Sequence, residues 1–287
     1  MKILITGCCG FIGFNISKYL LDKGFKIFGV DNLNDYYDVK IKKERLREIK
    51  KYKNFKFNKL DISNNKQLKK VFLKNKFNSV INLAAQAGVR YSIENPRKYL
   101  MSNTVGFYNI LENSRIKSIK NLIFASSSSV YGDKSKFPIK ETDNLNPKNF
   151  YGLTKKNNEE MAETYSNLYK MNICGLRFFT VYGEWGRPDM FMLKYINSKK
   201  KFDLFNKGEH YRDFTYIKDV NLIFSKLLKK KLKGYNIFNV CSNNPIKITK
   251  IIQKINSYLD KKNIKINKLG LQRADVIKTH GNNKKIK

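Results

Sequence analysis

The sequence is poor in the residues that build metal centres and disulfide frameworks. Its 287 residues include four cysteines and two histidines. Cys8 and Cys9 are adjacent, Cys174 and Cys241 stand alone, and no pair has C-x-x-C spacing. This pattern excludes a zinc-finger or disulfide-rich scaffold, so we expect small buried thiols and no metal site.

Long apolar runs are also missing. No stretch reaches the roughly 18–20 apolar residues that a membrane-spanning helix needs. The chain passes from its first residue directly into the short segment MKILITG. We therefore expect no membrane span and no signal peptide, and we place the protein in the cytoplasm.

Acidic residues are few: 23 stand against 58 lysines and arginines, which gives a formal net charge of +35. Such a charge can indicate a nucleic-acid partner. Here only nine of the basic residues are arginine, and the lysines are spread along the whole chain among many asparagines and isoleucines. This distribution favours solvated lysines, and we do not expect nucleic acid to be the partner.

The first informative motif is a glycine loop near the start of the chain. Residues 2–6 (KILIT) predict a buried strand, and Gly7, Gly10 and Gly13 follow with G-x-x-G-x-x-G spacing. A helical pattern then runs from residue 11 to a glycine at 24. Such a loop lets the backbone approach a pyrophosphate, which lies on the N-terminus of the helix.

The next strand completes a dinucleotide-binding unit. Residues 25–30 predict a strand that ends at Asp31. A carboxylate in this position can bind the ribose 2′-hydroxyl and would repel a 2′-phosphate, which favours NAD over NADP. Cys8 and Cys9 then occupy free positions of the loop, where their backbone N–H groups matter more than their sulfurs.

Strand and helix patterns alternate along the chain. Further strands are expected at 55–60, 79–85, 121–126, 172–178 and 235–240, with helices at 97–115 and 150–169. This order predicts an α/β fold: a Rossmann-type, doubly wound parallel sheet with a smaller C-terminal lobe. We expect the cofactor domain to span residues 1–176, with strand 235–240 returning to it, and the lobe to span 177–287.

A tyrosine and a lysine four residues apart give the candidate catalytic pair. Tyr151 and Lys155 lie in YGLTK, so on a helix both side chains share one face. An ammonium about 4 Å from the phenol contributes roughly 4 kcal/mol at an effective dielectric of 20, or about three pKa units. That shift, with a nicotinamide cation adding to it, would make Tyr151 a working base.

Several longer motifs resemble a known family. They are DNLNDYYDVKIKKERL (31–46), NLAAQAGVRYSIENP (82–96), SSSSVYG (126–132), YGLTKK (151–156), LRFFTVYGEWGRPDM (176–190) and YRDFTYIKDV (211–220). They are similar to the extended short-chain dehydrogenase/reductase family. Within it, the chain most resembles the NAD-dependent nucleotide-sugar epimerases that act on UDP-glucuronate. The resemblance runs from residue 1 to about residue 279.

The resemblance implies a set of NAD-binding residues. The pyrophosphate residues would be Gly7, Gly10, Phe11, Ile12 and Gly13, and the ribose residues Asp31 and Asn32. Asp61 and Ile62 would contact the adenine, and Ala84, Ala85 and Gln86 would line the path of the cofactor. Asn103 and Phe178 would lie at the nicotinamide, with Tyr151 and Lys155 beside it.

It also implies the substrate site and the reaction. Ser127 matches the catalytic hydroxyl that hydrogen-bonds the sugar O4, and Ser128, Ser129 and Thr180 match positions that face the sugar and its carboxylate. Arg90 and Arg187 match positions near the sugar-phosphate end, and Arg212 matches the residue that binds the diphosphate. In this family the tyrosine takes the proton of the 4′-hydroxyl while NAD⁺ takes hydride from C4. The 4-keto sugar then turns and is reduced on its other face, so C4 is inverted.

Two alternatives stay open at this stage. Related dehydratases and decarboxylases carry acidic residues where this chain has Ser128 and Ser129, which favours simple epimerisation, but a neutral UDP-hexose is a possible substrate. The family pattern Q-P-G-D-V is replaced by QRADV (272–276), and family members usually continue beyond the final residues here. A shortened lobe would leave a non-catalytic protein that binds NAD or a polyanion. The family further implies a homodimer through helices 97–115 and 150–169.

Overall fold

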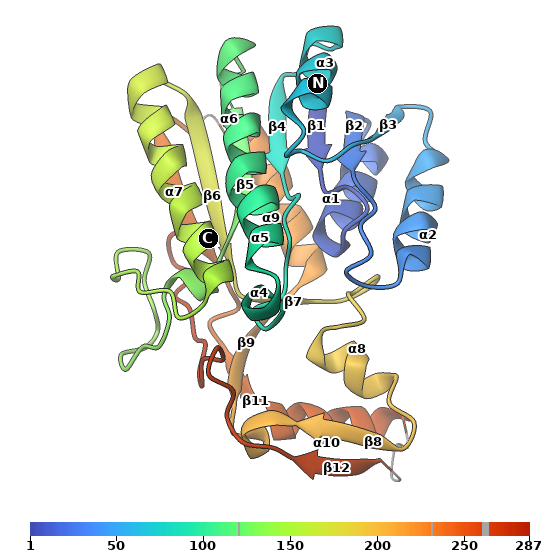
Figure 1. Cartoon of the computed structure of the whole chain (residues 1–287), viewed down its shortest axis with the longest axis vertical. Coiled ribbons are helices and arrows are strands. Elements are labelled where there is room, and N and C mark those ends of the chain that lie inside the picture. The colour runs from blue at the N-terminus through green and yellow to red at the C-terminus, as the bar shows by residue number, and fades with distance from the viewer. Residues whose placement is uncertain (120, 231, 260–263) are drawn as a thin grey trace.

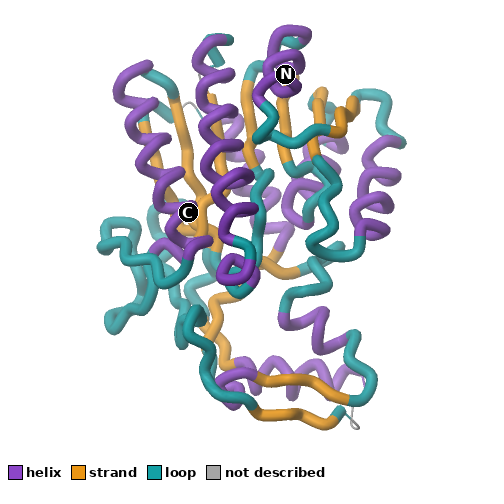
Figure 2. Tube along the Cα trace, viewed as in Figure 1, coloured by secondary structure: helices purple, strands orange, loops and turns teal. Residues whose placement is uncertain are grey.

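The computed structural model describes residues 1–119, 121–230, 232–259 and 264–287. Its larger part is a seven-stranded sheet with the order β10-β6-β5-β4-β1-β2-β3 (Figures 1 and 2). Every neighbouring pair is parallel. The strands are β1 (Lys2–Thr6), β2 (Lys26–Asp31), β3 (Phe55–Lys59), β4 (Ser79–Asn82), β5 (Asn121–Ser127), β6 (Asn172–Phe178) and β10 (Tyr235–Val240). The predicted parallel α/β sheet is thus confirmed.

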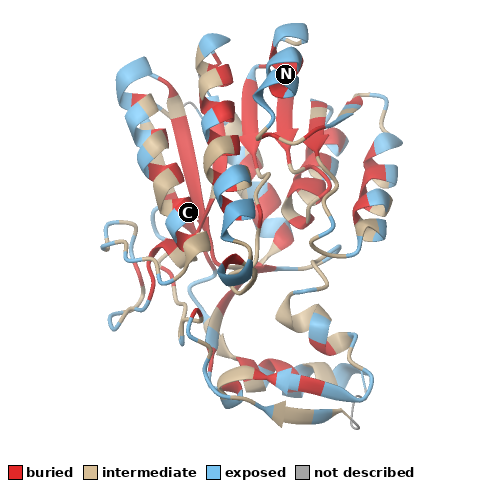
Figure 3. Cartoon of the chain, viewed as in Figure 1, coloured by how far each residue is buried: buried red, intermediate tan, exposed pale blue. Residues whose placement is uncertain are grey.

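Helices cover both faces of this sheet. One face carries α1 (Phe11–Asp22), α2 (Val39–Lys50) and α9 (Ile217–Lys229), and the other carries α3 (Asn65–Lys74), α6 (Gly106–Ile116) and α7 (Phe150–Tyr169) (Figure 1). Alternate residues of β1 supply the two cores, because successive strand side chains point to opposite faces. Ile3 and Ile5 pack with α1 and α9, whereas Leu4 packs with α3 and α6. All three are fully buried, and the red interior of Figure 3 follows the strands.

A smaller lobe lies below the carboxyl ends of the strands (Figure 1). It contains α8 (Phe191–Ile196), β8 (Lys201–Leu204), the 3₁₀ turn Phe205–Gly208, α10 (Ile248–Leu259) and β12 (Lys265–Lys268). A three-stranded sheet of β7 (Thr180–Tyr182), β9 (Tyr211–Tyr216) and β11 (Pro245–Lys247) leads into it. Tyr195, Phe202 and Ile251 form part of its separate core. The residues after 177 therefore contribute to both parts of the molecule, because α9 packs on the large sheet and β10 is one of its strands.

The helix predicted over 97–115 is confirmed in its extent, but it is not a regular α-helix throughout. It consists of α5 (Pro96–Tyr99), a π-helical turn (Leu100–Val105) and α6, and the separate short helix α4 (Tyr91–Glu94) precedes it. The wider π turn carries Asn103, whose side chain is buried and bonds the backbone of Gln86. π turns of this kind occur mostly inside α-helices near functional sites, and the spacing of apolar residues does not reveal them. The predicted helices 11–24 and 150–169 are confirmed as α1 and α7.

Candidate active site

The glycine loop after β1 forms an anion-binding cradle. Gly7 has a φ of 69°, a left-handed conformation that glycine adopts freely. A Cβ atom on Gly13 would lie 2.0 Å from the carbonyl oxygen of Gly7, so only glycine fits there. Helix α1 begins at Phe11, and no side chain caps its N-terminus. Its first N–H groups are left for an anion such as the pyrophosphate of NAD, so the loop fits that cofactor.

Asp31 lies at the end of β2, beside this loop. It is only 7% exposed, and its carboxylate accepts hydrogen bonds from the backbone N–H groups of Leu33 (2.8 Å) and Cys9 (3.0 Å). Burial raises the pKa of Asp31, and the two N–H groups and Lys42 oppose that shift. Asp61, at the end of the next strand, accepts a hydrogen bond from the amide of Asn32 (2.7 Å). Asn32, the residue after Asp31, therefore links the strand ends that carry the acids predicted for ribose and adenine.

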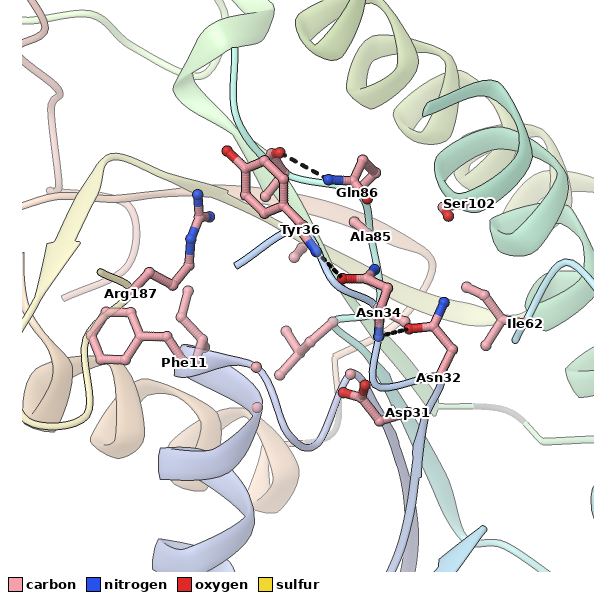
Figure 4. Close-up of a pocket in the computed structure, with 18 of the residues that line it drawn as sticks. Phe11, Asp31, Asn32, Asn34, Tyr36, Ile62, Ala85, Gln86, Ser102 and Arg187 are labelled. Carbon is pink, nitrogen blue, oxygen red and sulfur yellow. Dashed lines mark hydrogen bonds between the residues drawn. The ribbon is translucent and has the colours of Figure 1, made fainter. Parts of the chain in front are cut away.

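One long cavity unites most of the predicted cofactor residues with the catalytic pair (Figure 4). In that view Asp31, Asn32 and Ile62 lie on one side and Arg187 lies on the opposite side. The predicted residues that line this cavity are Gly7, Gly10, Phe11, Ile12, Gly13, Asp31, Asn32, Asp61, Ile62, Ala84, Ala85, Gln86, Ser127, Tyr151, Lys155, Phe178 and Arg187. The carboxyl ends of the strands place them there, as expected for an open parallel sheet.

The candidate catalytic residues reach this cavity from two elements. Ser127 ends β5, while Tyr151 and Lys155 come from the first turns of α7. The side chain of Asn149 caps α7 by accepting a hydrogen bond from the N–H of Gly152 (2.8 Å). Lys155 is 3% exposed, and its Nζ donates to the carbonyl oxygen of Ala125 in β5 (2.8 Å). The bond therefore joins α7 to β5 close to Ser127 and Tyr151.

The predicted lowering of the Tyr151 pKa by Lys155 is wrong. Burial raises the pKa of Tyr151, and the groups that oppose the rise are the Ser127 hydroxyl and Arg187. The Nζ of Lys155 lies 5.8 Å from the Tyr151 ring centre and bonds a carbonyl group instead. Burial lowers the pKa of Lys155 to about 8, against the attraction of Glu159. The i, i+4 spacing places both residues on one face but does not bring the charges together.

A second cavity opens between the sheet and the lobe. Three of the predicted substrate residues line it: Arg90, Thr180 and Arg212. Arg90 forms an ion pair with Asp275 (2.6 Å) and lies 3.8 Å above the ring of Phe205. Burial lowers the pKa of Arg212 to about 10. Cationic and aromatic groups together suit a ligand with an anionic part and a flat ring.

Tyr36 stands between the two cavities and lines both. Its hydroxyl donates to the carboxylate of Asp189 (3.1 Å), which also binds the guanidinium of Arg187 through two hydrogen bonds (3.0 and 2.5 Å). Burial raises the pKa of Tyr36 to about 12, and the Asp189 carboxylate adds to the rise. The phenol is thus a neutral donor near pH 7.

Three predicted residues line neither cavity. Asn103 is buried, accepts from the N–H of Gln86 (2.7 Å) and donates to Thr154 (3.0 Å). Ser128 and Ser129 form a 3₁₀ turn, and the N–H of Ser129 donates to the Ser127 hydroxyl (3.1 Å). Their predicted contacts with cofactor and sugar stay predictions.

Sequence reasoning missed several lining residues. Tyr36, Tyr37 and Lys42 line the first cavity, while Asp189 and His210 line the second. The first three follow Asp31 within 31–46, so their closeness to a binding acid was the available signal. Asp189 lies two residues after Arg187 within 176–190, which was its available signal, whereas nothing comparable distinguishes His210.

Among the described residues, no group of three or more histidine, cysteine, aspartate or glutamate side chains is placed to hold a metal ion. None of the described helices has the length and apolar character to cross a membrane.

Comparison with known proteins gives the geometry a family context. Residues 3–241 match the NAD dependent epimerase/dehydratase family. Protein CapI of Staphylococcus aureus is 46% identical over 98% of this chain and 90% of its own length. A UDP-glucuronate 4-epimerase of Thermodesulfobacterium geofontis is 42% identical over 95% and 85%. The crystal structure of a Bacillus cereus UDP-glucuronic acid 4-epimerase with UDP-glucuronic acid and NAD superposes with a TM-score of 0.92 at 30% identity, over 100% of this chain and 91% of that one.

Proposed function

Since the chain belongs to the NAD dependent epimerase/dehydratase family, we propose that it interconverts UDP-glucuronate and UDP-galacturonate. It is an NAD-dependent nucleotide-sugar 4-epimerase. The observation that carries the proposal is one cavity in which the glycine loop, Ser127, Tyr151 and Lys155 meet. Similarity to UDP-glucuronate 4-epimerases over nearly the whole chain supports the choice of substrate.

In the proposed reaction the side chains hold the sugar and move its O4 proton. The chemistry that bound NAD⁺ supplies is reversible hydride transfer at C4 of the sugar. Tyr151 takes the proton from the 4′-hydroxyl and later returns it, while the Ser127 hydroxyl bonds O4. Lys155 keeps the first turns of α7 against β5 through its bond to Ala125. The first N–H groups of α1, with Gly13 in the first turn, would hold the pyrophosphate.

The second cavity is proposed to hold the UDP part. Arg90 and Arg212 carry the positive charge that a diphosphate requires, and Phe205 supplies an aromatic face. Thr180 lines this cavity, and Arg187 lines the first, so the sugar and its carboxylate would lie between them. Ser128 and Ser129 introduce no carboxyl group near C5 or C6, which favours epimerisation over dehydration or decarboxylation.

Incubation of the purified protein with UDP-glucuronate and NAD⁺, followed by chromatography of the UDP-sugars, tests the proposal. We expect a mixture of UDP-glucuronate and UDP-galacturonate. The variant Tyr151→Phe is the matched control, because it keeps the ring and removes the proton acceptor; full turnover by this variant would overturn the assigned base. Parallel reactions with UDP-glucose and UDP-N-acetylglucosamine test the alternative of a neutral UDP-hexose. Conversion of one of these sugars, with no conversion of UDP-glucuronate, would establish that alternative.

We also propose that the protein is a homodimer in the cytoplasm that supplies a sugar donor for polysaccharide synthesis. Exposed apolar side chains on the predicted dimer helices, Leu100, Met101, Tyr108 and Leu153, support the dimer. The four free cysteines suit a reducing compartment. Light scattering during size-exclusion chromatography tests the dimer, and Leu153→Glu should shift the mass to that of one chain.

A further inference from the structure

Arg45 is a fully buried cation that bonds the lining of the first cavity but belongs to the lining of neither cavity. It belongs to α2 and is 0% exposed. Within the described residues no carboxylate lies near enough to form an ion pair with it. A buried charge that lacks an acidic partner is expensive unless hydrogen bonds satisfy it, so its contacts call for an explanation.

The guanidinium of Arg45 joins three separate segments. Its Nη1 donates to the carbonyl oxygen of Cys9 in the glycine loop (3.0 Å) and to the hydroxyl of Tyr37 (2.7 Å). Its Nη2 donates to the carbonyl oxygens of Trp185 (2.6 Å) and Gly186 (3.1 Å). One side chain thus ties the cofactor loop to the segment that precedes Arg187.

The segment bound by Nη2 is held in an unusual conformation. Trp185 has a φ of 61°, in the left-handed region that bulky residues rarely adopt. Such a conformation persists only where surrounding contacts impose it. The Trp185 ring packs on Phe14 of α1 (5.1 Å between ring centres), and Asn15 donates to the carbonyl of Glu184 (3.1 Å). The carbonyl oxygens of Trp185 and Gly186, two successive residues, both accept hydrogen bonds from the same Nη2 atom of Arg45.

We infer that Arg45 is a positioning residue for Arg187: by fixing the Trp185–Gly186 backbone to the glycine loop, it sets where the Arg187 guanidinium meets the substrate. The inference rests on the proposed function, because it takes Arg187 as a substrate contact. A lysine at position 45 keeps the charge but lacks the fork that reaches both sides, so it cannot hold both segments.

A double-mutant cycle tests the inference by binding rather than by activity. All proteins carry Tyr151→Phe so that UDP-glucuronate is not turned over, and each is titrated with it calorimetrically at saturating NAD⁺. We expect Arg45→Lys to weaken binding about tenfold, and less than about twofold once Arg187→Met is present, because coupled residues are not additive. The control Arg47→Lys lies on the same helix, 70% exposed in an ion pair with Glu44, and should change nothing.

Additional measurements separate a positioning role from general damage. Trp185 is the only tryptophan, so its emission in Arg45→Lys should move to longer wavelength as the loop is released. If Arg45→Lys does not fold, Tyr37→Phe removes one acceptor and leaves the guanidinium, and we expect a two- to threefold loss that again disappears with Arg187→Met.

Three outcomes would overturn the inference. In the first, the replacements at 45 and 37 leave binding unchanged. In the second, they weaken it equally with and without Arg187. In the third, the Tyr151→Phe protein binds no UDP-glucuronate, which also removes the proposed function, whereas the first two outcomes leave that function standing.

Discussion

The Nζ of Lys155 in α7 donates a hydrogen bond to the carbonyl oxygen of Ala125 in β5, 2.8 Å away. Ala125 lies two residues before Ser127, and Lys155 lies one helical turn after Tyr151. This bond therefore fixes the distance between the elements that carry the proposed base and the proposed hydroxyl donor.

Replacement of Lys155 by methionine should abolish most turnover without unfolding the protein. The variant loses the bond to Ala125 that holds Tyr151 in place relative to Ser127, so we expect kcat to fall by about 10²–10⁴-fold. Burial already opposes the charge of Lys155, as its pKa of about 8 reflects, so an apolar side chain of similar length should fit. Chromatographic rates and thermal unfolding check both parts; undiminished kcat would contradict the role.

Gly13→Ala should disrupt cofactor binding. Its Cβ atom would lie 2.0 Å from the Gly7 carbonyl oxygen, so the loop must open. We expect the dissociation constant for NAD⁺ to rise at least about tenfold, a loss of about 1.4 kcal/mol. Gly270→Ala is the control, because nothing lies within 4 Å of its added carbon. Equal NAD⁺ affinity in both variants, measured by calorimetry, would rule out the cradle.

Glu159→Gln should destabilise the fold strongly. Glu159 forms a buried ion pair with Arg177 (2.7 Å), with both side chains 5% exposed, and also accepts from Ser126. Removing one charge leaves the guanidinium buried without its partner, which costs about 3–5 kcal/mol. The neighbouring Glu160 pairs with Lys156 at 3.8 Å and is 63% exposed, so Glu160→Gln should cost less than about 1 kcal/mol. Urea unfolding of the two variants gives the comparison, and similar midpoints would refute it.

His210 should make the free energy of unfolding fall in mildly acidic solution. It is 5% exposed, and burial with nearby Arg212 lowers its pKa from 6.5 to about 4. Since the unfolded chain binds the proton more tightly, stability is complete above pH 6.5 and falls as the pH drops toward 4. Between pH 7.5 and 5 we expect a loss of about 2 kcal/mol, absent in His210→Gln. Denaturant midpoints at the two pH values measure it, and an equal loss in the variant would exclude His210 as the cause.

Much of this molecule could be predicted from local sequence. The glycine spacing, the apolar strands and the position of Asp31 depend on neighbours along the chain, and the structure places them as expected. The π turn around Asn103 could not be predicted, because apolar spacing does not reveal such a turn and the Asn103 side chain bonds Gln86 in another segment. Likewise, the i, i+4 spacing placed Tyr151 and Lys155 on one face but could not show that the lysine bonds Ala125.

The sequence by itself therefore determined the parallel α/β fold, the cofactor loop and the shared helix face of Tyr151 and Lys155, because periodicity and glycine conformation are local properties. Only the tertiary structure decided which side chains stand between the cavities and how they are held. Tyr36 meets Asp189, and Arg45 meets Trp185, across 153 and 140 residues of chain. Such contacts form only when segments distant in the sequence pack together, so local spacing along the chain does not predict them.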